Sequence, residues 1–346
     1  MKRLLLAVIL LLFTAASAEL AAGGSHALYL DGEGVLWAWG SNQKGESVPE
    51  SAEERILVPE IALRDVKSIA AGRQISCAVT TDNTLNVWGS ISLYIEGVTA
   101  VSACEEVVTY LTEDGRAHVY AVEKVDLPVE NVVKTATAAE FVLLLTVDNC
   151  AYIYENSETR LLMENIGDIS ACGETGMLLG DDGCVYIFGQ SGTEGRLGLD
   201  TTAEVETPVS NGITDARSLA AGLTCSCAIS SDNRLYGWGM LYSYLSAFDE
   251  NGDLLAAANA GCLINYGKTP IVIFEGIVDA AIGDAFIVSE TQTGQLMTWG
   301  SNDQGQLGIG LYTRIDCVED EETEEGYEIS VLESNQGVFP EFIDIP

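Results

Sequence analysis

The chain has 346 residues, and its 16 Lys and Arg against 52 Asp and Glu give a formal net charge of −36 at pH 7. A surface this acidic repels phosphate backbones and anionic lipid, which excludes nucleic acid as an expected partner. Because 47% of the residues are apolar and 35 are Gly, the composition also excludes an intrinsically disordered acidic protein.

The N-terminus has the three parts of a secretory signal peptide. Lys2 and Arg3 precede a ten-residue apolar run, Leu4 to Phe13, and Ala16-Ser17-Ala18 supplies small residues for cleavage. The run is too short to span a bilayer, which needs about 20 residues, and no later stretch is apolar enough. We therefore expect a signal peptide over 1–18, a secreted or cell-surface protein, and one domain over 19–346.

Two features recur along the remaining chain. A turn pair stands six positions before an aromatic residue that ends a short predicted strand, and Asp-Gly or Asp-Asn between apolar runs is a hairpin signal. A small residue stands ten positions before each turn pair, which indicates a close approach of neighbouring backbones at a crowded axis. The aromatic residues are Trp39, Trp88, Tyr120, Tyr154, Phe188, Trp238 and Trp299. The small residues are Gly23, Gly72, Cys104, Ala138, Cys172, Gly222 and Gly283.

Seven units of this kind predict an all-β, seven-bladed β-propeller, since four-stranded units repeated radially form that fold. Variation in spacing falls after the aromatic residue, where the longer units add a strand that begins with Pro, such as Pro59 or Pro270. The C-terminal Pro340 to Ile345 looks like that strand, and Ala21-Ala22-Gly23 looks like the strand that follows it. We therefore expect the N- and C-terminal strands to share one blade and close the ring.

The stretches AAGGSHAL with WGSN, at 21–28 and 39–42, and TWGSNDQGQLG, at 298–308, resemble the repeat of regulators of chromosome condensation. The chain is thus similar to the RCC1-like repeat β-propeller family. Nuclear members of that family exchange nucleotide on a small GTPase and dock on chromatin, but the signal peptide and the absence of a basic tail here argue against that role. Secreted members include a protein that grips β-lactamase with one propeller face. The resemblance therefore favours a protein-binding module.

Catalytic motifs are sparse. The two His are His26, expected to be a hydrogen-bonded core residue, and His118, which has no adjacent nucleophile motif, although distant residues could still converge. No GxSxG, HExxH or P-loop occurs. We expect no enzyme activity, no cofactor and no metal. The acidic run 316–328 lacks the D-x-D-x-D-G pattern of a calcium loop and is expected to be a solvated loop.

The predicted function is therefore secreted protein binding through one face by a monomer, with a partner that is extracellular and basic. A carbohydrate-binding surface and, behind it, a propeller hydrolase are the alternatives. Loops after the aromatic strands all leave on one face, and Tyr is typical of recognition surfaces. The candidate binding residues are Tyr94, Tyr242, Tyr244, Phe248 and Tyr312.

Nine Cys leave at least one thiol without an intramolecular partner. Cys262 and Cys317 lie in the two longest loops and are the best disulfide candidates. Cys104 and Cys172 occupy the small inner position of the third and fifth units, which are not adjacent, so we do not expect them to pair.

Overall fold

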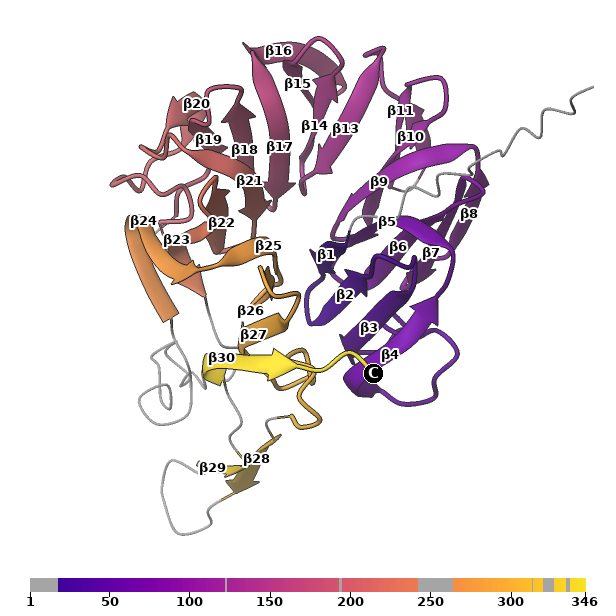
Figure 1. The fold of residues 1–346 in the computed structure, drawn as a ribbon, viewed down its shortest axis with the longest axis vertical. Helices are drawn as coiled ribbons and strands as arrows, with labels where there is room; N and C mark the ends of the chain where they lie inside the picture. Colours follow the sequence, from indigo (N-terminus) through magenta and orange to yellow (C-terminus); the bar gives the residue numbers. More distant parts are fainter. Residues whose placement is uncertain are drawn as a thin grey trace, which may run out of the picture.

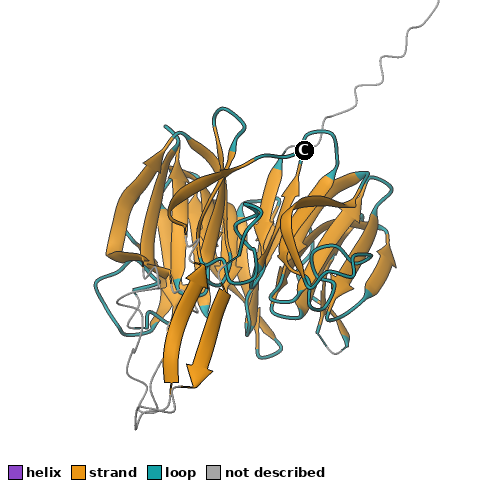
Figure 2. Ribbon diagram, turned by 90° about the horizontal axis from the view of Figure 1, so that it is seen from below, coloured by secondary structure: helices purple, strands orange, loops and turns teal. Residues whose placement is uncertain are grey.

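The computed structural model describes residues 18–121, 123–192, 195–241, 264–312, 314–319, 327–333 and 337–346. Within these ranges every regular element is a β-strand, and seven four-stranded antiparallel sheets stand around a central axis (Figure 1). Seen from the side, the sheets form a disc (Figure 2). The predicted seven-bladed propeller is confirmed.

Blades 1 to 4 each consist of four strands that are consecutive in the chain. Their bounds are β1 (Glu19–Ala22), β2 (His26–Leu30), β3 (Leu36–Ser41) and β4 (Arg55–Leu63); β5 (Val66–Ala71), β6 (Ile75–Thr80), β7 (Thr84–Gly89) and β8 (Leu93–Glu96); β9 (Val98–Cys104), β10 (Val107–Thr112), β11 (Ala117–Tyr120) and β12 (Lys124–Asp126); β13 (Val132–Thr137), β14 (Phe141–Thr146), β15 (Cys150–Glu155) and β16 (Glu158–Glu164).

Blades 5 and 6 follow the same order, whereas blade 7 takes its fourth strand from the C-terminus. The bounds are β17 (Ile166–Cys172), β18 (Thr175–Gly180), β19 (Val185–Gly189) and β20 (Val205–Ser210); β21 (Ala216–Ala221), β22 (Cys225–Ser230), β23 (Arg234–Leu241) and β24 (Ile264–Glu275); β25 (Ile277–Ile282), β26 (Phe286–Thr291), β27 (Leu296–Gly300) and β30 (Gly337–Ile343).

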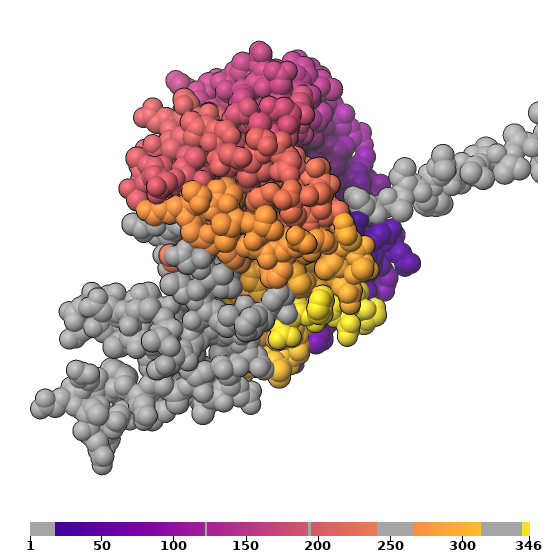
Figure 3. All heavy atoms as spheres, turned by 60° about the vertical axis from the view of Figure 1, so that its left-hand side comes forward, coloured from indigo at the N-terminus to yellow at the C-terminus, as the bar shows by residue number. Residues whose placement is uncertain are grey.

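The expectation that the two chain ends share a blade is wrong. β1 is the inner strand of blade 1, while β30 pairs with β27 as the outer strand of blade 7. The outer strand begins three or more residues before its proline, ends one blade, and is followed by the small-residue strand that begins the next. The chain therefore closes the ring with two complete blades lying side by side. Figure 3 shows the C-terminal segment of blade 7 against the N-terminal segment of blade 1.

Hydrogen bonds between blades 7 and 1 hold this seam. The Leu20 N–H donates to a carboxylate oxygen of Asp279 at 3.0 Å, and the Asp284 N–H donates to the Gly24 carbonyl at 3.1 Å. Leu20, Trp39, Phe286 and Ile343 also belong to one buried apolar cluster. The seam is therefore packed like a protein interior and does not depend on a shared sheet.

The predicted turn pairs lie between the second and third strands of every blade. The second residue of each pair has a positive φ, from 58° at Asn149 to 81° at Gly34. In six of the seven turns the carbonyl of that residue accepts a hydrogen bond from the first inner strand residue of the next blade, as Gly34 does from Val66. We call the face that carries these turns the hairpin face, and the opposite face, where the inner and aromatic strands end, the loop face.

The expectation that the acidic run 316–328 is a solvated loop is wrong at both ends of the run. Its ends lie in β28 (Arg314–Glu319) and β29 (Tyr327–Glu333), which pair as a separate two-stranded sheet. Apolar Ile315, Cys317 and Val318 stand among the acids and suit a strand, but the high acid content of the run outweighed that signal in the sequence. Residues 320–326 lie outside the described residues.

Candidate functional site

The recurring aromatic residues sit at the loop-face end of each third strand, between blades. The side chains of Trp39 and Trp238 are 0% exposed and that of Trp299 is 2% exposed, which confirms them as inter-blade core. Trp88 is partly buried against the cluster that contains Trp39.

Three of these indoles donate a hydrogen bond to the preceding blade, two of them to its loop and one to its outer strand β24. The indole N–H groups of Trp39 and Trp238 donate to the carbonyls of Gln306 and Arg196, at 3.0 and 2.9 Å. The indole of Trp299 donates to the Tyr266 hydroxyl at 2.7 Å. The loops of blades 7 and 5 therefore lie over the aromatic residues of blades 1 and 6.

Blade 4 has no such loop, because only Asn156 and Ser157 connect its third and fourth strands. Both have a positive φ, of 50° and 63°, as in a two-residue type I′ turn. A turn this short does not reach over Phe188, the aromatic residue of blade 5. A pocket of about 380 Å³ lies there, on the loop face between blades 4 and 5.

Two phenylalanine rings form the apolar part of this pocket. Phe141, from the start of β14, and Phe188, from the end of β19, have ring centroids 5.6 Å apart with their planes tilted by 36°. Both rings are largely buried, so each contributes an edge to the wall. A Phe at position 188 suits an uncovered position, because it has no N–H group that needs an acceptor.

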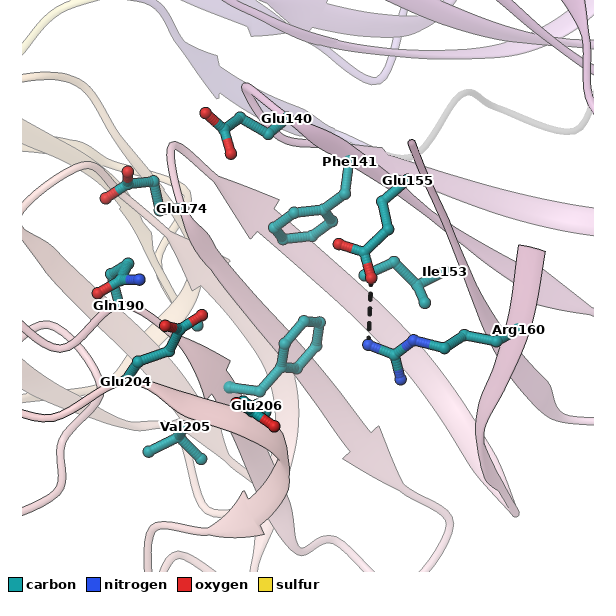
Figure 4. Close-up of a pocket in the computed structure, with 12 residues that line it drawn as sticks. Glu140, Phe141, Ile153, Glu155, Arg160, Glu174, Gln190, Glu204, Val205 and Glu206 are labelled. Atoms are coloured by element: carbon teal, nitrogen blue, oxygen red, sulfur yellow. Dashed lines mark hydrogen bonds and ion pairs between the residues drawn. The ribbon is translucent and has the colours of Figure 1, made fainter. Parts of the chain in front are cut away.

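Five glutamates line the pocket: Glu140, Glu155, Glu174, Glu204 and Glu206. Figure 4 shows their carboxylates distributed around Phe141, with the guanidinium of Arg160 beside Glu155. The pocket is thus apolar inside and strongly acidic at its rim.

Two of the five carboxylates already have a cation. Arg160 pairs with Glu155 at 3.3 Å and Arg196 pairs with Glu174 at 3.6 Å. Within the described residues, no ion pair or side-chain hydrogen bond engages the exposed Glu140, Glu204 and Glu206. These three carboxylates can receive a positive charge from outside the chain.

The predicted aromatic binding set is only partly visible. Tyr94 is 68% exposed, but it lies within the outer strand β8 opposite Asn86, not in a loop as expected. The chain after Trp88 turns back after three residues, so the strand begins earlier than its spacing indicated. Tyr312 lies in a loop of blade 7, half-buried, with the Arg55 guanidinium 4.9 Å from its ring centroid. Tyr242, Tyr244 and Phe248 lie outside the described residues.

The cysteine expectations divide similarly. Cys262 lies outside the described residues, and only the backbone of Cys317, in β28, is described, so their pairing stays a prediction. Cys104 and Cys172, which were not expected to pair, are both free thiols in this structure. They nevertheless line the same mouth of the central channel, because the inner strands of all blades converge at the axis.

His26 is a buried core residue, as expected. Its ring is 0% exposed and its Nε2 lies 2.9 Å from the Ser76 hydroxyl, which in turn donates to the Glu46 carbonyl. Burial lowers the pKa of His26 to about 4. The residue therefore joins blade 1 to blade 2 as a neutral group.

His118 stands in a geometry that resembles a catalytic triad. Its Nδ1 lies 2.8 Å from Asp126 Oδ1, and its Nε2 lies 3.2 Å from the Thr112 hydroxyl. However, that hydroxyl donates its single hydrogen to Asp114 at 2.6 Å, as Thr80, Thr146 and Ser230 do to their own turn aspartates. Thr112 is thus a repeated hairpin element, not a hydroxyl activated by His118.

In the described residues, no three His, Cys, Asp or Glu side chains gather closely enough to hold a metal ion. Over the same ranges, no helix is long and apolar enough to cross a membrane.

The sequence matches known proteins over short segments. Residues 18–46 and 66–90 match the family described as Regulator of chromosome condensation (RCC1) repeat. A 75-residue stretch is 44% identical to Guanine nucleotide exchange factor SRM1 of Saccharomyces cerevisiae, covering 20% of this chain and 16% of that protein. A 115-residue stretch is 30% identical to RCC1 domain-containing protein RUG3, mitochondrial, of Arabidopsis thaliana, covering 32% and 26%. The matches thus span about a quarter or less of these relatives.

The fold matches solved structures over almost the whole chain. The structure of Prp20p from Saccharomyces cerevisiae superposes with a TM-score of 0.68 at 16% identity, covering 92% of this chain and 88% of that one. Human WBSCR16 superposes with a TM-score of 0.67 at 16% identity, covering 90% and 94%. These similarities show the propeller fold, and the match over 18–46 and 66–90 supports the RCC1-like repeat.

Proposed function

We propose that this RCC1-like propeller is a secreted binding module that captures a basic protein through its loop face, and that the pocket between blades 4 and 5 receives a Lys or Arg side chain of the partner. The observation that carries the proposal is the pocket itself. It combines two Phe edges with the carboxylates of Glu140, Glu204 and Glu206, for which no cationic partner is found in the described residues.

This chemistry suits a long basic side chain better than a small ion. The aliphatic stem of Lys or Arg packs on apolar surface while its charged end stays among polar groups. Arg160 and Arg196 already place a charged end among these polar groups, since each directs its guanidinium to a rim carboxylate. A partner's cation completes a site that the chain's own arginines fill only in part.

Three further observations support the wider proposal. The net charge of −36 favours a basic partner and rapid association at low ionic strength. The structure of Prp20p, which shares the fold, is described with that protein's binding to Gsp1p and histones. For secretion, β1 begins at Glu19, directly after the predicted cleavage site.

A glycan is the alternative occupant, because aromatic edges and carboxylates also suit sugar rings. No specific contact in the structure favours it over a basic side chain. A glycan array screened with the same protein separates the two, since a sugar site retains its ligand at salt concentrations that screen an ionic contact.

The decisive experiment is capture from the secreted and cell-surface fractions of the source organism with three immobilised proteins. These are the wild type, the triple variant Glu140→Gln, Glu204→Gln and Glu206→Gln, and a control variant with equal charge change on the hairpin face, Glu33→Gln, Glu130→Gln and Glu164→Gln. We expect the pocket variant to lose the captured protein and the control to retain it. Capture that is equal with all three proteins would reject the pocket as the binding site.

A further inference from the structure

The central channel opens on the loop face between the ends of the inner strands. Two of the side chains that line this mouth are thiols, Cys104 at the end of β9 and Cys172 at the end of β17. The other inner positions around the mouth carry small residues, including Gly23, Gly72 and Gly283. Blade 4, which lies between the two cysteines in the ring, contributes only Ala138 at this level.

The two thiols influence each other across this mouth. Each is the largest influence on the other's pKa, and both line the same opening of about 90 Å³. A disulfide requires Cβ atoms about 3.5–4.5 Å apart, so this link needs the side chains at the ends of β9 and β17 to meet across the one opening that both line. Both residues are free thiols in this structure.

The surroundings make Cys104 the more reactive of the two. The hydrogen bonds from Cys172 and Gly173 lower the pKa of Cys104, whereas the contact with Cys104 and burial raise the pKa of Cys172. The pKa of every other described thiol is raised, chiefly by burial: Cys77, Cys150, Cys184, Cys225 and Cys227. Among the described thiols, Cys104 is therefore the one favoured to form a thiolate and to attack.

We propose that Cys104 and Cys172 form a redox-active pair that closes into a disulfide across the mouth of the channel by exchange with a small soluble disulfide. The Cys104 thiolate attacks one sulfur of the small disulfide and releases one small thiol. Cys172 then loses its proton and attacks Cys104 in the mixed disulfide, which releases the second small thiol. Two protein thiols are oxidised and one small disulfide is reduced to two thiols.

The bond would join blade 3 directly to blade 5 and enclose all of blade 4. A propeller ring is otherwise held by contacts between neighbouring blades, so a link across the axis restrains three blades at once. Because a disulfide stabilises chiefly by restricting the unfolded chain, and more for a longer loop, the oxidised protein should melt at a higher temperature. The secretory route predicted from the N-terminus would provide the oxidising conditions in which such bonds persist.

The test uses the full chain, first reduced and freed of reductant, then treated with 2-hydroxyethyl disulfide. We expect mass mapping of non-reduced peptides to find the Cys104–Cys172 link, the free-thiol count to fall by two, and the melting temperature to rise by about 5 °C or more. Mapping needs only the wild-type chain, so the result does not depend on a variant that folds.

The matched variants are Cys104→Ser and Cys172→Ser against Cys150→Ser and Cys184→Ser, which are partly exposed thiols away from the channel. The first two should abolish the rise in melting temperature, and the last two should leave it unchanged. The proposal is overturned if oxidation leaves a stable mixed adduct on Cys104, if Cys104 and Cys172 link to other thiols, or if both stay free while Cys150 and Cys184 react.

Discussion

The indole N–H of Trp39 donates to the main-chain carbonyl of Gln306, a residue 267 positions later in the chain. This bond joins the first blade to the last and places the loop of blade 7 over the aromatic residue of blade 1. The Trp238 indole donates in the same way to the Arg196 carbonyl in the loop of blade 5, so the arrangement is not confined to the seam. Above Phe188, where blade 4 has no such loop, the pocket opens.

Replacing Trp39 with Phe should destabilise the protein by about 1–3 kcal/mol, because the buried Gln306 carbonyl loses its donor. Trp88→Phe is the matched control, since the buried Trp88 Nε1 finds no partner among the described residues. Removing that donor should cost less or even stabilise the fold. Equal losses in the free energy of unfolding in urea would show that ring size, not the hydrogen bond, matters.

The left-handed turns of the hairpin face can be tested with two glycines of equal φ. Gly97 and Gly183 both have φ of 79°, but a Cβ on Gly97 meets nothing within 4 Å, whereas one on Gly183 lies 2.9 Å from the Thr214 carbonyl. Gly97→Ala should cost only the backbone strain of about 1–2 kcal/mol. Gly183→Ala should cost more, because the neighbouring backbone must also move. Thermal unfolding that ranks them in reverse would contradict close approach at this turn.

The last strand offers a matched pair on adjacent residues. Ile343 is 5% exposed and packs in the cluster at the seam, while Phe342 on the same strand is 59% exposed. Ile343→Ala should therefore destabilise by about 2–5 kcal/mol. Phe342→Ala should change the free energy of unfolding by about 0.5 kcal/mol or less. A larger loss in the free energy of unfolding for Phe342→Ala than for Ile343→Ala would show that β30 pairs with β27 in a different register.

Stability should fall as the pH rises from about 4 to about 7, through two carboxyl groups at the seam. Burial raises the pKa of Glu19 to about 7 and that of Asp279 to about 6, so the folded state binds these protons more tightly than the unfolded state does. Raising the pH removes the protons and with them this contribution to folding.

The measurement is the pH dependence of urea unfolding for the wild type and for the double variant Glu19→Gln with Asp279→Asn. Both chains keep Ala18, so that Glu19 does not itself carry the terminal ammonium. The wild type should lose stability relative to the double variant across that window. His26 acts in the opposite direction, since its lowered pKa costs stability as the pH falls below 6.5, but both proteins share it. A difference that does not vary with pH would show that these carboxyls are not desolvated.

The sequence by itself determined the repeating unit. The turn pairs, the aromatic residues and the small inner residues are local signals, because tight turns, strand ends and close backbone contacts each restrict the residue types that fit. They were sufficient for seven blades and for the core role of Trp39 and Trp238, whereas the buried His26 was expected from the resemblance to the repeat family. The short connection at Asn156 and Ser157 was also visible, although its consequence was not.

Only the tertiary structure decided how the units meet. The blade boundary falls after the Pro-led strand, a choice that the repeat itself leaves open because the pattern is cyclic. The position of Cys104 and Cys172 at one opening depends on the radius of the ring, which is set by packing between blades and not by the sequence of either strand. The pocket above Phe188 likewise exists because blade 4 lacks a loop that would cover this residue of blade 5. Such a relation between neighbouring blades cannot be seen within a single repeat.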